Sequence, residues 1–222
     1  MVRTIDDVNR PDGLIVDFYG VLTDGIDTAM RAWSELDGID YTHFQDAMAE
    51  WFGDFGGFEA RFNPVHALER GEMQIPDFEN ELARRLVTRE GDPIRADGLV
   101  RRMFSRFGHA PDMAGLVRRA KASGIRTALL SNSWGDQYLR EGWQDMFDTV
   151  VISGEVGMRK PESRIFELTV SRLGLDPSAC VFVDDHVDNI QAAAALGIIG
   201  VWHQTYEQTA AELEAIFGAT LA

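Results

Sequence analysis

The strongest constraint on the fold is the alternation of short apolar runs with longer helical patterns. Five such runs follow one another along the chain, and they are GLIVDF (13–18), IRTALLS (125–131), FDTVVIS (147–153), CVFVDD (180–185) and IIGVW (198–202). Apolar residues three or four positions apart mark helices at 111–124, 164–174, 188–197 and 206–218. Strands that alternate with helices are typical of a parallel sheet. The sequence therefore predicts an α/β fold with a parallel sheet of about five strands and helices on both faces.

The interval between the first two runs is much longer than a strand connection requires. It contains about a hundred residues, whereas a crossover between parallel strands needs about a dozen. Most of the interval has helical patterns and no convincing strand. We therefore predict an α/β core formed by residues 1–25 and 108–222, and an inserted α-helical cap domain at 26–107.

Composition limits the partners of the chain. Its formal charge is −15 over 222 residues, which disfavours nucleic acid, because a phosphate backbone is bound by a dense basic surface. The apolar runs are too short to span a bilayer, and the N-terminal residues lack the apolar core of a signal peptide. We expect a cytoplasmic protein without a nucleic-acid or membrane partner. The oligomeric state stays unassigned.

Chemically capable side chains follow the ends of four predicted strands. They are, in chain order, Asp17, Ser131, Asn132, Lys160, Asp184 and Asp185. Any one of them alone would fit a turn or a helix cap equally well. Ligands of open parallel sheets bind at the carboxyl ends of the strands, where all six would meet. We therefore treat them as one candidate site.

The residue types in this set suit phosphoryl transfer. An aspartate can attack phosphorus and form an aspartyl-phosphate, which divides one difficult displacement into two easier ones. Three converging carboxylates repel one another unless a divalent cation lies among them, and oxygen ligands favour Mg²⁺. Ser131 and Asn132 can donate hydrogen bonds to phosphoryl oxygens, and Lys160 can supply a positive charge. A small phosphorylated metabolite is the expected substrate.

Four stretches in this order resemble the signature motifs of the haloacid dehalogenase superfamily. They are DFYGVLTD (17–24), LLSNS (129–133), RKPESRIF (159–166) and VFVDDHVDNIQAAAALG (181–197). The resemblance implies a Rossmann-like core, and the place of the insertion is similar to that of the helical-cap branch. The stretch ALERGEMQIPDFENEL (67–82) further resembles relatives of the phosphatase domain of soluble epoxide hydrolases.

The resemblance also implies roles for individual residues. Asp17 would be the nucleophile and a ligand of Mg²⁺, with the backbone carbonyl of Tyr19 and the carboxylate of Asp185 as further ligands. Asp184 would hold a metal-bound water. Ser131, Asn132 and Lys160 would bind the phosphate.

The cap is expected to recognise the leaving group, but the sequence indicates few residues for this task. Arg70 is a candidate for substrate binding, together with Glu72 in the same turn, and both charges would also fit solvated helix ends. The aromatic residues Trp33, Trp51 and Phe55 fit the core of the cap better than the wall of a substrate site.

Tyr19 departs from the pattern of most phosphatases of this superfamily, which have a second aspartate two positions after the nucleophile. That aspartate protonates the leaving alcohol and then activates water, and such help is worth about 10² to 10⁴ in rate. A phenol with a pKa near 10 is a poor base at neutral pH, although it can donate a proton. Alternatively, Tyr19 packs beneath the cap.

The order Asp, any residue, Tyr, Gly is also similar to the opening motif of L-2-haloacid dehalogenases, which need no metal. Asp184 and Asp185 argue against that reading, because they would repel a carboxylate substrate. Phe166 stands where the dehalogenase pattern has a tyrosine. We predict a Mg²⁺-dependent hydrolase of small phosphate esters. A metal-independent 2-haloacid dehalogenase and a module that binds a phosphate ligand or a protein without turnover are the alternatives.

Overall fold

The computed structural model describes residues 10–52 and 63–221. Its five strands form one parallel sheet in the order β3-β2-β1-β4-β5. The strands are β1 (Gly13–Val16), β2 (Arg126–Ser131), β3 (Thr149–Ile152), β4 (Cys180–Asp184) and β5 (Ile199–Trp202). The three central strands are almost fully buried, as expected for a sheet that is covered on both faces. The predicted α/β fold with about five parallel strands is confirmed.

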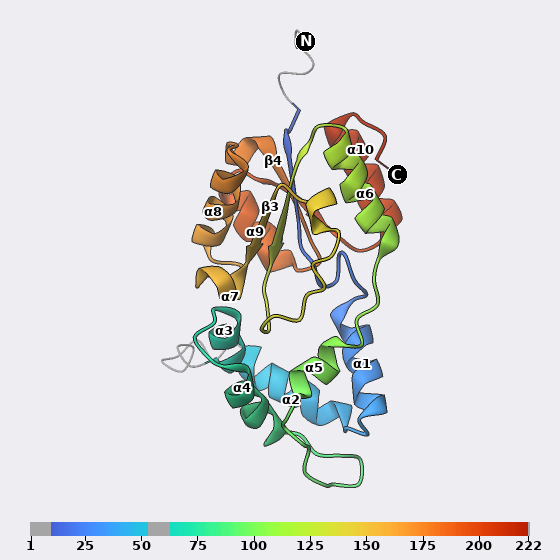
Figure 1. The fold of residues 1–222 in the computed structure, drawn as a ribbon, viewed down its shortest axis with the longest axis vertical. Helices are drawn as coiled ribbons and strands as arrows, with labels where there is room; N and C mark the ends of the chain where they lie inside the picture. The colour runs from blue at the N-terminus through green and yellow to red at the C-terminus, as the bar shows by residue number, and fades with distance from the viewer. Residues whose placement is uncertain (1–9, 53–62, 222) are drawn as a thin grey trace.

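Helices cover both faces of the sheet (Figure 1). On one face, α6 (Pro111–Ala122) and α10 (Tyr206–Phe217) pack against Leu14 and Val16 of β1. On the other face, α8 (Ser163–Leu173) and α9 (Val187–Ala195) pack against Ile15. Successive residues of a strand point to opposite faces, so the continuous apolar run of β1 supplies both cores.

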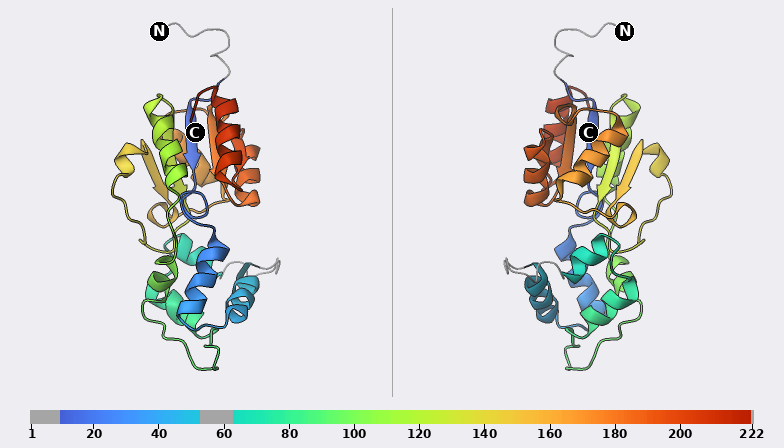
Figure 2. Two further views of the ribbon diagram at one scale, coloured as in Figure 1. Left: turned by 90° about the vertical axis from the view of Figure 1, so that its right-hand side faces the viewer. Right: turned by 90° about the vertical axis from the view of Figure 1, so that its left-hand side faces the viewer.

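The described part of the predicted insertion, residues 26–107, contains five helices. They are α1 (Ile26–Leu36), α2 (Tyr41–Phe52), α3 (Pro64–Glu69), α4 (Ile75–Ala83) and α5 (Leu99–Phe104). They form a layer beyond the carboxyl ends of the strands (Figures 1 and 2). Their own apolar cluster contains Trp33, Phe78 and Leu82, all fully buried. The insertion therefore has a core of its own and lies where a cap over the sheet would lie.

The chain enters and leaves the insertion at one place. The backbone N–H of Asp24 donates to the carbonyl of Gly108 at 3.0 Å, and that of Ala110 donates to the carbonyl of Leu22 at 3.0 Å. The predicted division into 1–25, 26–107 and 108–222 falls beside this pairing and stays a prediction.

Short helices and irregular loops complete the core. They include α7 (Ser153–Val156) and the 3₁₀ turns Trp143–Asp145 and Pro177–Ala179. In the cap, Trp33 and Trp51 are buried, in line with a packing role, and Phe55 lies outside the described residues. No described helix is long and apolar enough to cross a membrane.

Candidate active site

Three carboxylates meet where β1 and β4 end. The strand order changes direction at β1, which has β2 on one side and β4 on the other, and ligands bind at such switch points. The backbone N–H of Asp17 donates to the carbonyl of Val183 at 2.9 Å, which holds Asp17 beside the end of β4. Carboxylate oxygens of Asp17, Asp184 and Asp185 all lie within 4.8 Å of one another. These side chains form the floor of the candidate site.

Lys160 reaches this floor from the loop between α7 and α8. Its Nζ lies 2.8 Å from Oδ1 of Asp17 and 2.6 Å from Oδ2 of Asp184, and the side chain is 1% exposed. Asn132 holds the backbone of Lys160 in place. The amide nitrogen of Asn132 donates to the Lys160 carbonyl at 3.0 Å, and its carbonyl oxygen accepts from the Lys160 N–H at 2.8 Å. Asn132, which directly follows β2, thereby positions Lys160 beside Asp17, which directly follows β1.

The carboxylate of Asp184 is enclosed by donors. Besides Lys160, it accepts hydrogen bonds from the amide of Asn189 at 3.0 and 3.1 Å and from the backbone N–H of His186 at 2.8 Å. It is fully buried. A buried carboxylate with this many donors keeps a fixed orientation, so Asp184 is a rigid part of the floor.

The floor carries more negative than positive charge. Three carboxylates and one ammonium group leave two negative charges uncompensated. Burial raises the pKa of Asp17 to about 8, against the opposing charge of Lys160 and with help from Asp184 and Asp185. Burial and the charge of Asp184 also raise the pKa of Asp185. A bound divalent cation would remove this penalty, and the all-oxygen donors suit Mg²⁺.

Gly20 allows the loop after β1 to approach the floor. Its φ of +84° lies in the left-handed region, and a Cβ built at this position would lie 2.2 Å from Oδ2 of Asp185. Its backbone N–H donates to the hydroxyl of Thr23 at 3.0 Å, which holds the turn. Only a glycine meets both the backbone and the contact requirement, so Gly20 places the loop against a carboxylate of the floor.

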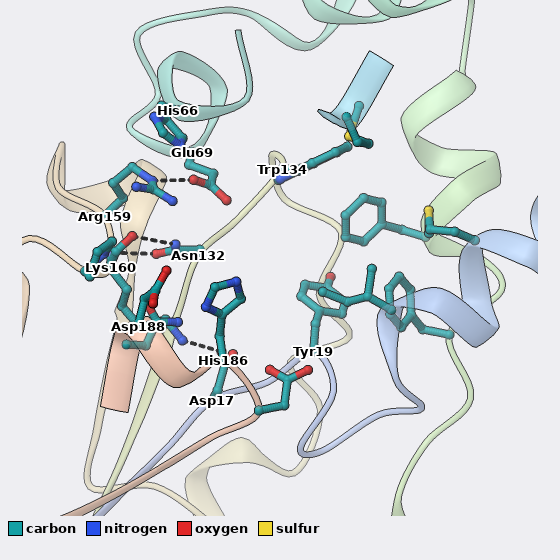
Figure 3. Close-up of a pocket in the computed structure, with 18 of the residues that line it drawn as sticks. Asp17, Tyr19, His66, Glu69, Asn132, Trp134, Arg159, Lys160, His186 and Asp188 are labelled. Carbon is teal, nitrogen blue, oxygen red and sulfur yellow. Dashed lines mark hydrogen bonds and ion pairs between the residues drawn. The ribbon is translucent and has the colours of Figure 1, made fainter. Parts of the chain in front are cut away.

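A pocket of about 640 Å³ lies between this floor and the cap (Figure 3). Asp17, Lys160 and Asp185 line it from the core, and Asn132 lines it from the end of β2. Helices α1, α2, α3 and α5 contribute the opposite wall. The cap therefore covers the charged floor, as a domain that excludes water from a reaction would.

Tyr19 lies between the floor and the cap. Its ring centroid is 4.9 Å from that of Phe104 and 4.8 Å from that of Phe107, and the residue is 9% exposed. The hydroxyl points into the pocket in Figure 3 and forms no hydrogen bond with another described residue. Burial and the charge of Asp17 raise the pKa of the phenol above its usual value. Tyr19 is therefore an uncharged donor at neutral pH.

Three residues that the sequence placed in the site lie outside the pocket lining, namely Asp184 of the floor, Ser131 and Arg70. The hydroxyl of Ser131 is buried and forms a 2.9 Å hydrogen bond with the hydroxyl of Tyr138. Arg70, at the end of α3, pairs with Glu72 at 2.8 Å and with Glu162 of the core at 3.4 Å. Their contacts with a substrate stay predictions, as does metal coordination by the Tyr19 carbonyl.

Three titratable pocket residues at the boundary between core and cap were not identified from the sequence. Arg159 forms a partly buried ion pair with Glu69 of α3 across the boundary between core and cap, and His66 lies beside them (Figure 3). Burial raises the pKa of Glu69, although Arg159 opposes the shift. Burial and the charges of Arg159 and Arg70 lower the pKa of His66 to about 4. Glu69 and Arg159 are 90 positions apart, so no local sequence signal could have paired them.

Parts of the chain are similar to several characterised proteins. Over 115 residues, half of the chain, it is 37% identical to acyl-CoA dehydrogenase family member 10 of Mus musculus. Over 111 residues, 48% of the chain, it is 31% identical to the sesquiterpene phosphatase astK of Aspergillus oryzae. Over 109 residues, 46% of the chain, it is 28% identical to bifunctional epoxide hydrolase 2 of Sus scrofa. These alignments cover 11%, 56% and 20% of the respective relatives.

Solved structures share the fold over most of the chain. A HAD family enzyme of Bacteroides thetaiotaomicron, in complex with magnesium and inorganic phosphate, matches 87% of this chain and 94% of its own, with a TM-score of 0.65 and 18% identity. A dehalogenase structure matches 89% of both chains, with a TM-score of 0.59 and 20% identity. At such identities the likeness shows the fold alone. The family model of haloacid dehalogenase-like hydrolases matches residues 11–197, and the chain belongs to that family.

Proposed function

We propose that this hydrolase is a Mg²⁺-dependent phosphatase of small phosphate monoesters, with Asp17 as its nucleophile. The observation that carries the proposal is the floor of three converging carboxylates and one buried lysine at the bottom of a covered pocket. The Aspergillus relative named as a phosphatase supports it.

Asp17 is oriented for attack on phosphorus. Its Oδ1 accepts a hydrogen bond from the N–H of Phe18 at 2.7 Å and pairs with Lys160 at 2.8 Å. Its Oδ2 receives no hydrogen bond from another described residue. In the first step a carboxylate oxygen of Asp17 bonds to phosphorus, the bond from phosphorus to the ester oxygen breaks, and the alcohol leaves with a proton. In the second step water breaks the aspartyl-phosphate, which returns the carboxylate and releases inorganic phosphate.

The floor fits a resident Mg²⁺ ion. Asp17, Asp184 and Asp185 supply oxygen ligands within reach of one another, and the Tyr19 carbonyl is the proposed further ligand. When bound, the ion would neutralise charge on the transferring phosphoryl group. Lys160 lies 2.8 Å from Oδ1 of Asp17 and would act together with the bound ion to keep the nucleophile ionised in a buried site.

We assign the proton of the leaving alcohol to the phenol of Tyr19. The phenol is uncharged, lines the pocket and follows the nucleophile by two residues. A weak acid of this kind can protonate an alkoxide, because an alkoxide is a stronger base than a phenolate. The phenolate that this transfer leaves recovers its proton from solvent, because the pKa of the phenol is raised. The restored phenol cannot accept a proton from the attacking water at neutral pH. We therefore expect hydrolysis of the aspartyl-phosphate to be slower than its formation.

The charges of the floor disfavour a dehalogenase. A 2-haloacid would have to place its carboxylate near Asp184 and Asp185, and the one lysine of the floor is already shared by Asp17 and Asp184. Like charges at this distance repel strongly in a buried site. A phosphate ester instead brings its charge together with the cation that the floor requires.

The test is an assay of phosphate release from a panel of small phosphate esters, with and without Mg²⁺, beside chloride release from 2-chloropropionate. Asp17→Asn is compared with Asp112→Asn, which changes an exposed carboxylate on α6. Phosphate release that requires Mg²⁺, survives in Asp112→Asn and is lost in Asp17→Asn supports the proposal. Metal-independent chloride release would replace it by the dehalogenase. Mg²⁺ binding without either release would indicate a module that binds but does not turn over.

A further inference from the structure

Apart from His66 and Glu69 of α3, the cap wall of the pocket is apolar. Opposite the charged floor, side chains from helices α1, α2 and α5 and from nearby loops line the pocket, namely Ile26, Met30, Phe44, Met48, Phe104, Phe107 and Trp134. Most of them also pack against the core of the cap, so packing holds the wall in place. The pocket thus joins a charged floor to an apolar wall, and the two parts would contact different parts of one ligand.

The cations of the described pocket residues are already engaged by carboxylates. Lys160 is shared by Asp17 and Asp184, and Arg159 is paired with the buried carboxylate of Glu69. On the proposed function, a phosphate would meet the cation held by the floor, but neither the lysine nor the arginine of the described lining is left unpaired for a second anionic group. A leaving group with its own phosphate or carboxylate would lose its hydration without a matching charge.

The size of the pocket leaves room for a sizeable organic group. A volume of about 640 Å³ lies within the range of about 300–1,000 Å³ that is typical of sites burying most of a drug-sized ligand. A phosphate on the floor would fill only a part of this space. The remainder lies against the apolar wall.

We propose that the leaving group is an uncharged, apolar alcohol, so that the substrate is the phosphate monoester of a hydrocarbon-rich alcohol whose chain lies against α1, α2 and α5. The inference rests on the proposed phosphatase function for the position of the phosphate. It adds the class of substrate, which the floor does not determine. Burial of the hydrocarbon against the wall would supply the binding energy for the organic part.

The test compares unbranched alkyl phosphates of increasing length. With saturating Mg²⁺, kcat/KM is measured for butyl, hexyl and octyl phosphate below their micelle concentrations, and for glycerol 3-phosphate as a polar ester. We expect kcat/KM to rise about two- to fourfold per methylene, the range that burial of a CH₂ group allows. Octyl phosphate should then exceed butyl phosphate at least about 15-fold. A flat or falling series, or a preference for glycerol 3-phosphate, would overturn the inference.

Helix α1 provides a matched pair of variants. Ile26 lines the pocket and is 51% exposed, whereas Leu36, at the other end of α1, is 65% exposed and does not line it. Ile26→Gln should lower the ratio of octyl to butyl kcat/KM several-fold, and Leu36→Gln should leave the ratio unchanged. Because both positions are exposed, neither change removes a core side chain. An equal effect of the two variants would contradict the proposed binding surface.

A binding measurement separates this inference from the proposed function. The Kd values of butyl and octyl phosphate are measured by calorimetry with the Asp17→Asn variant and Mg²⁺. If no ester is hydrolysed by the unsubstituted protein but the Kd falls with chain length, the phosphatase proposal fails and the apolar site stands. If the unsubstituted protein releases phosphate at a rate that is independent of chain length, and the Kd of Asp17→Asn is also independent of it, the phosphatase proposal is supported and the apolar binding site is refuted.

Discussion

Replacement of Gly20 by alanine tests whether the loop after β1 shapes the metal site. The new Cβ would lie 2.2 Å from Oδ2 and 2.6 Å from Cγ of Asp185, whereas ordinary contacts of a Cβ begin at about 3.4 Å. The carboxylate therefore has to move by about 1 Å, or the loop has to move away from it. Either movement exceeds the tolerance of about 0.2 Å that metal–ligand distances allow. We expect Gly20→Ala to damage the proposed Mg²⁺ site beyond its effect on the backbone.

The two effects have different magnitudes. An alanine in the left-handed region costs about 1–2 kcal/mol, and for a chain of this size each kcal/mol lowers the Tm by about 2–4 °C. The Tm of the metal-free protein should thus fall by about 2–8 °C. Displacement of Asp185 should also raise the Kd for Mg²⁺ at least about tenfold, the lower range found when support around a metal ligand is lost.

Gly197 supplies the control for the backbone effect. It has a φ of +89°, and a Cβ built there meets no atom within 4 Å. Gly197→Ala should therefore lower the Tm by a similar amount and leave the Kd for Mg²⁺ unchanged. Thermal unfolding in EDTA and calorimetric titration with Mg²⁺ measure the two quantities. Equal weakening of Mg²⁺ binding in both variants would contradict a specific role of Gly20 in the proposed site. Unchanged Mg²⁺ binding in Gly20→Ala would contradict it as well.

Three further predictions concern the floor and its proton donor. Tyr19→Phe should lower kcat/KM for an alkyl phosphate about 10²-fold but have a much smaller effect on p-nitrophenyl phosphate, whose leaving group needs no proton; equal losses would assign Tyr19 a packing role only. Burial raises the pKa of Asp17 from 3.8 to about 8, so the proton on this group stabilises the metal-free fold at low pH, and that contribution is lost as the pH rises towards 8. The Tm in EDTA should accordingly decline as the pH rises from 3.8 to about 8, and Asp17→Asn should remove the decline. An unchanged pH profile in Asp17→Asn would contradict the raised pKa of Asp17. Lys160→Met leaves buried carboxylates without their cation and should lower the free energy of unfolding in EDTA by about 3–5 kcal/mol. Mg²⁺ should restore part of that loss, and denaturant unfolding with and without the metal would show whether it does.

The core could be predicted from the sequence because its signals are local. The run that ends at Val16 and the run that ends at Asp184 are continuously apolar, and fully buried parallel strands require that pattern. Once the strands were placed, the rule that ligands bind at their carboxyl ends brought Asp17, Asp184 and Asp185 together. The structure places them within ligand distance of one another.

Side-chain direction was the part that sequence reasoning could not supply. Ser131 lies at the end of a strand as expected, but its hydroxyl forms a hydrogen bond with the hydroxyl of Tyr138, seven residues further along the chain. Arg70 lies in the cap turn as expected, but it pairs with Glu162 of the core and does not line the pocket. Both directions follow from tertiary packing, and neither partner is indicated by spacing or periodicity.

The tyrosine at position 19 connects the chemistry of the floor with the character of the wall. A carboxylate in its place would lie against the rings of Phe104 and Phe107 and would add a fourth negative charge to a floor that already has two in excess. Both the apolar contact and the like charges would oppose its ionisation. The phenol avoids these costs, because it donates a proton without carrying a charge and extends the apolar wall to the edge of the floor. If Tyr19 is the proposed proton donor, it would favour departure of an apolar alcohol and slow the water-dependent second step. The expected kinetic signature is a burst of alcohol release ahead of phosphate release.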